Sequence, residues 1–219
     1  MIKLVIFDLD GTLLNTLDDL ADSCNYILEK YGFPIHPSDS YRYFVGNGIS
    51  KLIERAIPED KRQPNFIEQL RLEFVVYYSL HAEDKTAPYE GIVTLLQDLR
   101  SHGIMLAVAS NKFMAGTQSL VKEYFGNIDF VSVFGQREGI PVKPDPRIVF
   151  DIMEESGITN KEEILYVGDT ATDMKTCTNA GIKGIGVLWG FRTEKELKEN
   201  GATYFVSKPS EIFDIIANK

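Results

Sequence analysis

The sequence contains little cysteine, little histidine and no long apolar run. Cys24 and Cys177 are its only cysteines, too few for a disulfide framework and not spaced as a metal-binding CxxC pair. A reduced, cytoplasmic setting is the simplest interpretation. The three histidines lie apart from the polar motifs described below, so a Ser-His-Asp triad or other histidine-based acid–base chemistry has no support.

Membrane and nucleic-acid functions also lack a sequence basis. The longest apolar run, Ile104 to Ala109, has six residues, whereas a membrane-spanning helix needs about 20. The N-terminal apolar run stops at Asp8, well before the length of a signal-peptide core. Acidic residues outnumber basic ones by 32 to 23, which argues against binding of a nucleic-acid polymer.

The remaining pattern alternates short apolar runs with segments of helical periodicity. Continuous apolar runs indicate strands that are buried on both faces, as in a parallel sheet. Strands are predicted over residues 3–7, 104–109, 130–134, 164–167, 184–187 and 204–206. Helices are predicted from Ile92 to just before Gly103, and over residues 115–124, 147–155 and 172–180. This alternation predicts an α/β fold, with a doubly wound parallel sheet and a Rossmann-like core.

Residues 15–84 interrupt the alternation and show no strand pattern. One apolar stripe at helical spacing comprises Leu17, Leu20, Ala21, Cys24, Ile27, Leu28 and Tyr31, and a second comprises Phe66, Leu70, Phe74 and Tyr77. We therefore expect a separate all-helical subdomain over residues 15–84, inserted into a sheet domain formed by residues 1–14 and 85–219. The connections near 14–16 and 82–88 are its only covalent links, so we expect the subdomain to move as a hinged lid.

The unusual polar residues follow the predicted strands. Open α/β sheets place their ligand sites at the carboxyl ends of parallel strands, so we expect these side chains to converge on one crevice. They are Asp8 and Asp10 after the first strand, Ser110 and Asn111 after the second, Lys143 after the third, and Asp169 and Asp173 after the fourth.

Carboxylates dominate this predicted crevice. Two like charges about 4 Å apart repel by about 4 kcal/mol at an effective dielectric constant near 20, so the cluster needs a cation. Hard oxygen ligands favour Mg²⁺. Lys143 and Ser110 would hold the other side of an anion, while Gly11 and Thr12 offer backbone N–H groups in a tight turn. The pattern indicates a Mg²⁺-dependent phosphoryl-transfer site acting on a small phosphorylated metabolite.

The spacing of Asp8 and Asp10 suggests a mechanism. In an extended segment, residues two apart point to the same side, so both carboxylates can face one phosphorus atom. One of them can attack phosphorus and form an aspartyl-phosphate. The other can protonate the leaving oxygen and then deprotonate the hydrolytic water.

Four motifs in this order resemble those of the haloacid dehalogenase-like hydrolase superfamily. They are Asp-x-Asp-Gly-Thr at 8–12, the serine at 110, the lysine of Lys-Pro-Asp-Pro at 143, and Gly-Asp-x-x-x-Asp at 168–173. The resemblance implies that Asp8 is the nucleophile and Asp10 the general acid–base.

The same resemblance implies the remaining roles. Ser110 and Lys143 would bind the phosphoryl group. Asp8, the carbonyl of Asp10 and Asp169 would hold Mg²⁺, with Asp173 acting through water or Lys143.

The helical insertion resembles the C1-type cap of this superfamily, which closes over the site and selects the substrate. Residues 13–20, Val45-Gly46-Asn47-Gly48 and Trp189-Gly190-Phe191 resemble the phosphoglycolate phosphatase branch, although that branch often has aspartate where Asn15 stands. The resemblance implies hydrolysis of a small phosphomonoester, phosphoglycolate-like first. Gly46 and Asn47 would either face the substrate or form an ordinary turn, and Asn111 would either bind the substrate or shape its own turn.

Three alternatives stay open. A phosphomutase of the β-phosphoglucomutase type shares the motifs, although Thr12 favours hydrolysis because those enzymes usually have valine there. Nucleotides or pyrophosphate could replace phosphoglycolate as substrate. A non-enzymatic phosphoaspartate signalling receiver uses a similar acidic cluster, but receivers are shorter and lack the insertion. A monomer is the default oligomeric state.

Overall fold

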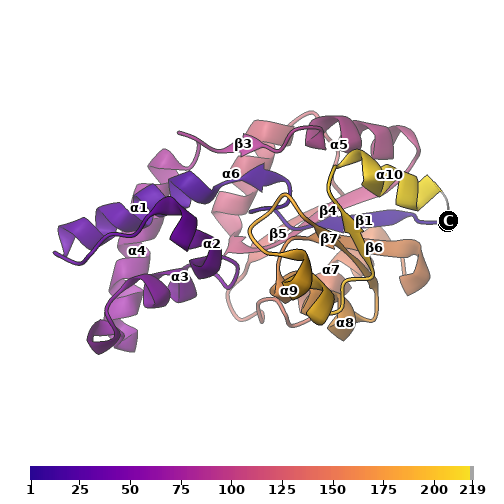
Figure 1. Cartoon of the computed structure of the whole chain (residues 1–219). Helices are drawn as coiled ribbons and strands as arrows, with labels where there is room; N and C mark the ends of the chain where they lie inside the picture. Colours follow the sequence, from indigo (N-terminus) through magenta and orange to yellow (C-terminus); the bar gives the residue numbers. More distant parts are fainter. Residues whose placement is uncertain (218–219) are drawn as a thin grey trace.

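The computed structural model describes residues 1–217, and its centre is a six-stranded, fully parallel sheet (Figure 1). The strand order is β5-β4-β1-β6-β7-β8. The bounds are Leu4–Phe7 for β1, Met105–Phe113 for β4, Ser132–Gln136 for β5, Ile164–Gly168 for β6, Lys183–Val187 for β7 and Tyr204–Val206 for β8. Counted in chain order within this sheet, the strands follow the doubly wound order 3-2-1-4-5-6. The α/β prediction is confirmed.

Helices cover both faces of the sheet, and alternate strand residues contribute to two separate cores. Val5 and Phe7 pack in the core under α5 (Ile92–Ser101), α6 (Met114–Phe125) and α10 (Ser210–Ala217). Leu4 and Ile6 pack in the core under α7 (Arg147–Ser156), α8 (Ala171–Ala180) and α9 (Glu194–Glu199). Burial on both faces explains why the strands read as continuous apolar runs.

A helical unit, residues 17–81, lies at the carboxyl ends of the strands (Figure 1). It contains α1 (Leu17–Lys30), α2 (Tyr41–Phe44), α3 (Ile49–Ala56), α4 (Pro64–His81) and two 3₁₀ turns, Ser38–Ser40 and Glu59–Lys61. The unit has its own hydrophobic core, in which the predicted α1 stripe is buried except for the half-buried Tyr31. Within the described chain, no helix combines the length and the apolarity needed to cross a membrane.

The structure corrects three local predictions. On α4, Tyr78 rather than Tyr77 joins Leu70 and Phe74 in the core, because a four-residue step keeps closer to one helix face than a three-residue one. Residues 14–15 and 87–88 pair as the short antiparallel strands β2 (Leu14–Asn15) and β3 (Ala87–Pro88), so the two connections to the helical unit lie side by side. The helices α9 and α10 were not predicted.

The strand β4 also extends beyond its predicted end at Ala109. Its pairing with β5 shifts register between Ala109 and Phe113, so residues 110–112 form an irregular segment inside the strand. Such irregularities redirect side chains near active sites. Here the irregular segment turns Ser110, Asn111 and Lys112 inward, and all three are buried.

Candidate active site

The predicted convergence of strand ends occurs between β1 and β6, where the strand order reverses. Asp8 directly follows β1, Asp169 directly follows β6, and Asp173 lies in the first turn of α8. Each of the three offers a carboxylate oxygen within 4.8 Å of the others, and all three are buried. The arrangement brings three negative charges into one small, water-poor volume.

Lys143 supplies the positive charge at the centre of this cluster. Its Nζ lies 3.0 Å from Oδ1 of Asp8 and 2.7 Å from Oδ1 of Asp173, and its side chain is 1% exposed. Nζ also donates to the carbonyl of Ala109 at 2.9 Å and to the hydroxyl of Tyr166 at 3.0 Å. Burial by itself lowers the pKa of Lys143, but the charges of Asp173 and Asp8 outweigh burial and raise this pKa, so Lys143 stays an ammonium.

The three carboxylates differ in their electrostatic environments. Burial, reinforced by the charge of Asp173, raises the pKa of Asp8 well above its usual range. The same two causes raise the pKa of Asp169 to about 7. Burial also opposes ionisation of Asp173, but Lys143 and hydrogen bonds from Thr170 outweigh it and lower the pKa of Asp173. One lysine therefore does not compensate all three carboxylates, and a further cation would stabilise the ionised cluster.

The backbone approaches Asp169 closely from two loops. At Gly11 (φ +83°) and at Gly190, an added Cβ would lie 2.4 and 2.3 Å, respectively, from atoms of Asp169. The Thr12 hydroxyl donates to Oδ1 of Asp169 at 3.2 Å, and the Phe191 amide donates to Oδ2 at 2.8 Å. Glycine is required at both positions because any side chain would overlap the carboxylate.

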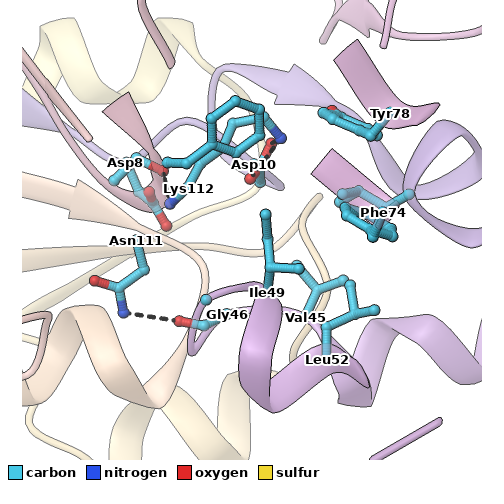
Figure 2. Close-up of a pocket in the computed structure, with 14 residues that line it drawn as sticks. Asp8, Asp10, Val45, Gly46, Ile49, Leu52, Phe74, Tyr78, Asn111 and Lys112 are labelled. Carbon is cyan, nitrogen blue, oxygen red and sulfur yellow. Dashed lines mark hydrogen bonds and ion pairs between the residues drawn. The ribbon is translucent and has the colours of Figure 1, made fainter. Parts of the chain in front are cut away.

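Asp10 lies beside the carboxylate cluster rather than within it. Its Oδ1 accepts a hydrogen bond from the Thr16 hydroxyl at 2.8 Å and one from Lys112 Nζ at 3.1 Å. Asp8 and Asp10 both line a cavity between the sheet and the helical unit, as their spacing predicted (Figure 2). Two carboxylates with different partners thus face the same space.

The predicted phosphate-binding residues occupy different positions. Ser110 is buried, lines the cavity, and accepts a hydrogen bond from the Lys112 amide at 3.2 Å. Thr12 is buried and directs its hydroxyl to Asp169. The Asn111 side chain accepts from the Lys143 amide at 2.9 Å and donates to the carbonyls of Lys143 and Gly46 at 3.0 and 3.1 Å. Asn111 therefore joins the lysine loop to the helical unit.

Gly46 and Asn47 lie in the loop of the helical unit that contacts the sheet domain. The side-chain Nδ2 of Asn47 donates to the Thr172 hydroxyl at 3.0 Å, and its Oδ1 accepts from Arg55 at 2.7 Å. Gly46 receives the hydrogen bond from Asn111 (Figure 2).

Two arginines make reciprocal contacts between the helical unit and the sheet domain. Arg42 donates to the carbonyl of Gly190 at 3.0 Å, and Arg192 donates to the carbonyl of Val45 at 3.0 Å. With the Asn47 and Asn111 bonds, they hold the helical unit over the strand ends.

Lys112 is a charged residue lining the cavity to which sequence reasoning gave no role. Its side chain is 2% exposed, pairs with Asp10, and lies 4.4 Å from the ring centre of Tyr78 on α4. A lysine that follows an unbroken apolar strand and sits beside a predicted site is an unusual residue, because lysine is almost never fully buried unless paired. That signal could have identified it.

Comparison with known proteins gives consistent matches over nearly the whole chain. The model of the haloacid dehalogenase-like hydrolase family matches residues 5–187. A phosphoglycolate phosphatase of Mesorhizobium japonicum is 32% identical over 90% of this chain and 86% of its own length. One from Pasteurella multocida is 30% identical, with 98% and 95% covered. A crystal structure of a protein from Lactobacillus delbrueckii subsp. bulgaricus superposes with a TM-score of 0.90, at 31% identity and 98% coverage of both chains.

Proposed function

The chain belongs to the haloacid dehalogenase-like hydrolase family, and we propose that this phosphatase hydrolyses a small phosphomonoester with the help of Mg²⁺, 2-phosphoglycolate being the first candidate. The observation that carries the proposal is the buried cluster of Asp8, Asp169 and Asp173 around Lys143. The names of the relatives in Mesorhizobium and Pasteurella favour phosphoglycolate among phosphomonoesters. Membership of a hydrolase family disfavours the receiver alternative.

The donor set of the cluster fits Mg²⁺. Three carboxylates offer hard oxygen ligands within 4.8 Å of one another, and burial together with the charge of Asp173 raises the pKa of Asp169 to about 7, so a cation beside Asp169 would favour its ionised form. Asp8, the carbonyl of Asp10 and Asp169 would hold the ion, with Asp173 acting through water or Lys143. Bound Mg²⁺ would neutralise charge on the phosphoryl oxygens during transfer.

The two cavity-facing carboxylates divide the acid–base work in this proposal. Asp8 attacks phosphorus through one carboxylate oxygen, and the ester oxygen departs with a proton from Asp10. Asp10 then takes a proton from water, whose oxygen attacks the aspartyl-phosphate and releases inorganic phosphate and free Asp8. Asp8 suits the attack because Lys143 holds one of its oxygens, and Asp10 suits proton transfer because it lies outside the cluster.

The remaining residues bind and position the phosphoryl group. Lys143 supplies a permanent positive charge, and the Ser110 hydroxyl supplies a hydrogen-bond donor. The backbone N–H groups of Gly11 and Thr12, which the sequence offered for this purpose, instead donate within their own turn to the carbonyls of Leu14 and Leu9. The helical unit, within residues 15–84, would act as a cap over the sheet domain of residues 1–14 and 85–219. Closure through Gly46 and Asn47 would exclude water from the first step, and partial opening would admit it for the second.

Phosphate release from a panel of esters tests the proposal. The panel contains 2-phosphoglycolate, a nucleoside monophosphate, a sugar phosphate and pyrophosphate, each assayed with Mg²⁺ and with a chelator. We expect Mg²⁺-dependent turnover with 2-phosphoglycolate preferred, and its complete loss in Asp8→Asn while circular dichroism stays unchanged. Asp18→Asn, at an exposed position on α1, is the matched control and should retain activity. Turnover that survives chelation or Asp8→Asn would refute the mechanism.

A further inference from the structure

The cavity beyond Asp8 and Asp10 has a wall that the proposed chemistry does not use. The cavity is small, with a volume of about 40 Å³, and it is partly open to solvent. The helical unit contributes mostly apolar side chains to this wall, among them Val45, Ile49, Leu52 and Phe74 (Figure 2). Leu20 lines the cavity as well. Two polar groups interrupt this wall on the side of Asp10: the ammonium of Lys112 and the hydroxyl of Tyr78.

Lys112 is the single cationic side chain among the described residues that line this cavity. Its Nζ lies 3.1 and 3.3 Å from the two carboxylate oxygens of Asp10. An ammonium carries three N–H donors, so the contact with Asp10 leaves Lys112 able to donate to a second acceptor. The side chain is nearly fully buried, which makes its charge effective at short range.

Tyr78 faces Lys112 from the helical unit. Its side chain is fully buried, and its hydroxyl lies close to the Lys112 ammonium, but no acceptor for the hydroxyl proton is present among the described residues. In Figure 2, the hydroxyl end of Tyr78 points to the side of the cavity where Lys112 and Asp10 lie. Burial raises the pKa of Tyr78 to about 12, so the hydroxyl keeps its proton and is a donor. Buried hydroxyls whose proton has no acceptor are rare in proteins, and this residue lines a cavity where a ligand could supply the acceptor.

The side-chain amide of Asn111, which also lines the cavity, has no N–H group left to donate to a substrate. Asn111 already gives both of its N–H groups to the carbonyls of Gly46 and Lys143. Lys112 and Tyr78 are therefore the side chains on this wall with donors left for a substrate.

We propose that Lys112 and Tyr78 form an anion subsite that binds a carboxylate on the leaving group of the substrate. The inference rests on the proposed function, in which Asp10 protonates the ester oxygen. Because Lys112 lies next to Asp10, its ammonium is close to the position of that oxygen. In a leaving group such as glycolate, a single methylene separates the ester oxygen from the carboxylate, so the carboxylate reaches the same region.

The subsite joins both parts of the molecule. Lys112 comes from β4 of the sheet, and Tyr78 comes from α4 of the helical unit. A carboxylate bound by both would favour the closed arrangement, whereas an uncharged leaving group would leave the two donors unpaired. Sites that leave buried polar groups unpaired discriminate strongly against the substrate lacking the group.

A comparison of two esters of equal carbon number tests the subsite. The probes are 2-phosphoglycolate and 2-hydroxyethyl phosphate, with p-nitrophenyl phosphate as a measure of general phosphatase competence. For Tyr78→Phe we expect kcat/KM on 2-phosphoglycolate to fall by about 10- to 100-fold, because one charge-assisted hydrogen bond is lost. On 2-hydroxyethyl phosphate the change should stay below about twofold. Lys112→Gln should lower the ratio of the two kcat/KM values further, and Lys112→Arg should partly restore it.

Tyr77→Phe provides the matched control, because the adjacent α4 residue stacks on Tyr26 and His81 away from the cavity. Equal losses on both esters in Tyr78→Phe and Lys112→Gln would overturn the subsite and leave both residues a purely structural role. A wild-type enzyme that hydrolyses p-nitrophenyl phosphate but does not prefer 2-phosphoglycolate over 2-hydroxyethyl phosphate would overturn it too, with the phosphatase intact. Absence of Mg²⁺-dependent turnover on every ester would instead contradict the proposed function, and the subsite with it.

Discussion

Replacing Lys143 by methionine should destabilise the metal-free protein in a pH-dependent manner. The lysine is 1% exposed and lies within 3.0 Å of both Asp8 and Asp173. Methionine has a similar length but no charge, so the variant leaves two buried carboxylates facing each other without a counter-ion. Breaking a buried ion pair from one side costs about 3–5 kcal/mol. We expect a loss of this size in the free energy of unfolding at pH 8.

The loss should shrink as the pH falls. Without the ammonium, the folded-state pKa of Asp8 rises further above its unfolded value of about 4, and the pKa of Asp173, which Lys143 holds low in the wild type, rises above that value too. A carboxyl whose folded pKa is raised loses stability as pH increases from the unfolded to the folded value. At pH 5 at least one of the two carboxyls should therefore be protonated in the folded variant. The remaining loss there should be about 1–3 kcal/mol.

Urea denaturation at pH 5 and pH 8, with a chelator present, measures this difference. The matched control is Lys122→Met, which removes an exposed lysine of α6 and should change stability by less than about 0.5 kcal/mol at either pH. A Lys143→Met protein as stable as wild type, or one destabilised equally at both pH values, would refute the electrostatic account of the cluster. Added Mg²⁺ should recover part of the stability at pH 8, because a bound cation replaces the missing charge.

Three further outcomes follow from the geometry. Asp19→Ala should lower the free energy of unfolding, measured by urea denaturation, by about 2–4 kcal/mol, because Oδ2 of this buried residue accepts three hydrogen bonds from residues 85 and 86. The control Asp18→Ala, at an exposed position, should lower it by less than about 0.5 kcal/mol. Gly11→Ala should weaken Mg²⁺ binding at least about tenfold by calorimetry, since its Cβ would lie 2.4 Å from Asp169. Mg²⁺ affinity should rise between pH 5 and 7, by about tenfold per pH unit for each proton displaced, because the carboxyl of Asp169, with a pKa of about 7, and that of Asp8, whose pKa is also raised, must lose their protons to bind. A flat profile would contradict this assignment.

The sheet and the acidic cluster could be predicted because their signals are local. The run at residues 4–7 alternates between two apolar cores, so no polar residue can occur in it until the strand ends at Asp8. The residues that follow β1 and β6 are then brought together by the parallel topology alone, whatever the helices do. Asp8 and Asp169 could therefore be paired from the sequence, although they are far apart in the chain.

The parts that could not be predicted depend on contacts between distant elements. The pairing of β2 with β3 involves two residues from each strand, too short for any periodicity to reveal. The irregular end of β4 also has no sequence period, because it arises where pairing with β5 changes register. The predicted strand therefore ends at Ala109, before Lys112, whereas the structure turns Lys112 into the cavity against Asp10.

Recognition of the phosphoryl group and recognition of the leaving group therefore depend on different features of the sequence. In the proposed function, the phosphoryl group is bound by side chains at strand ends, each of which belongs to a short sequence motif. The proposed subsite for the leaving group forms only when α4 of the helical unit packs against β4, because this packing places Tyr78 opposite Lys112. A substitution in α4 can then change which ester is preferred without touching the residues proposed to transfer the phosphoryl group. Substrate preference should consequently vary among proteins that share the four motifs. In this chain, we expect the side chains at positions 78 and 112 to decide which leaving group is preferred.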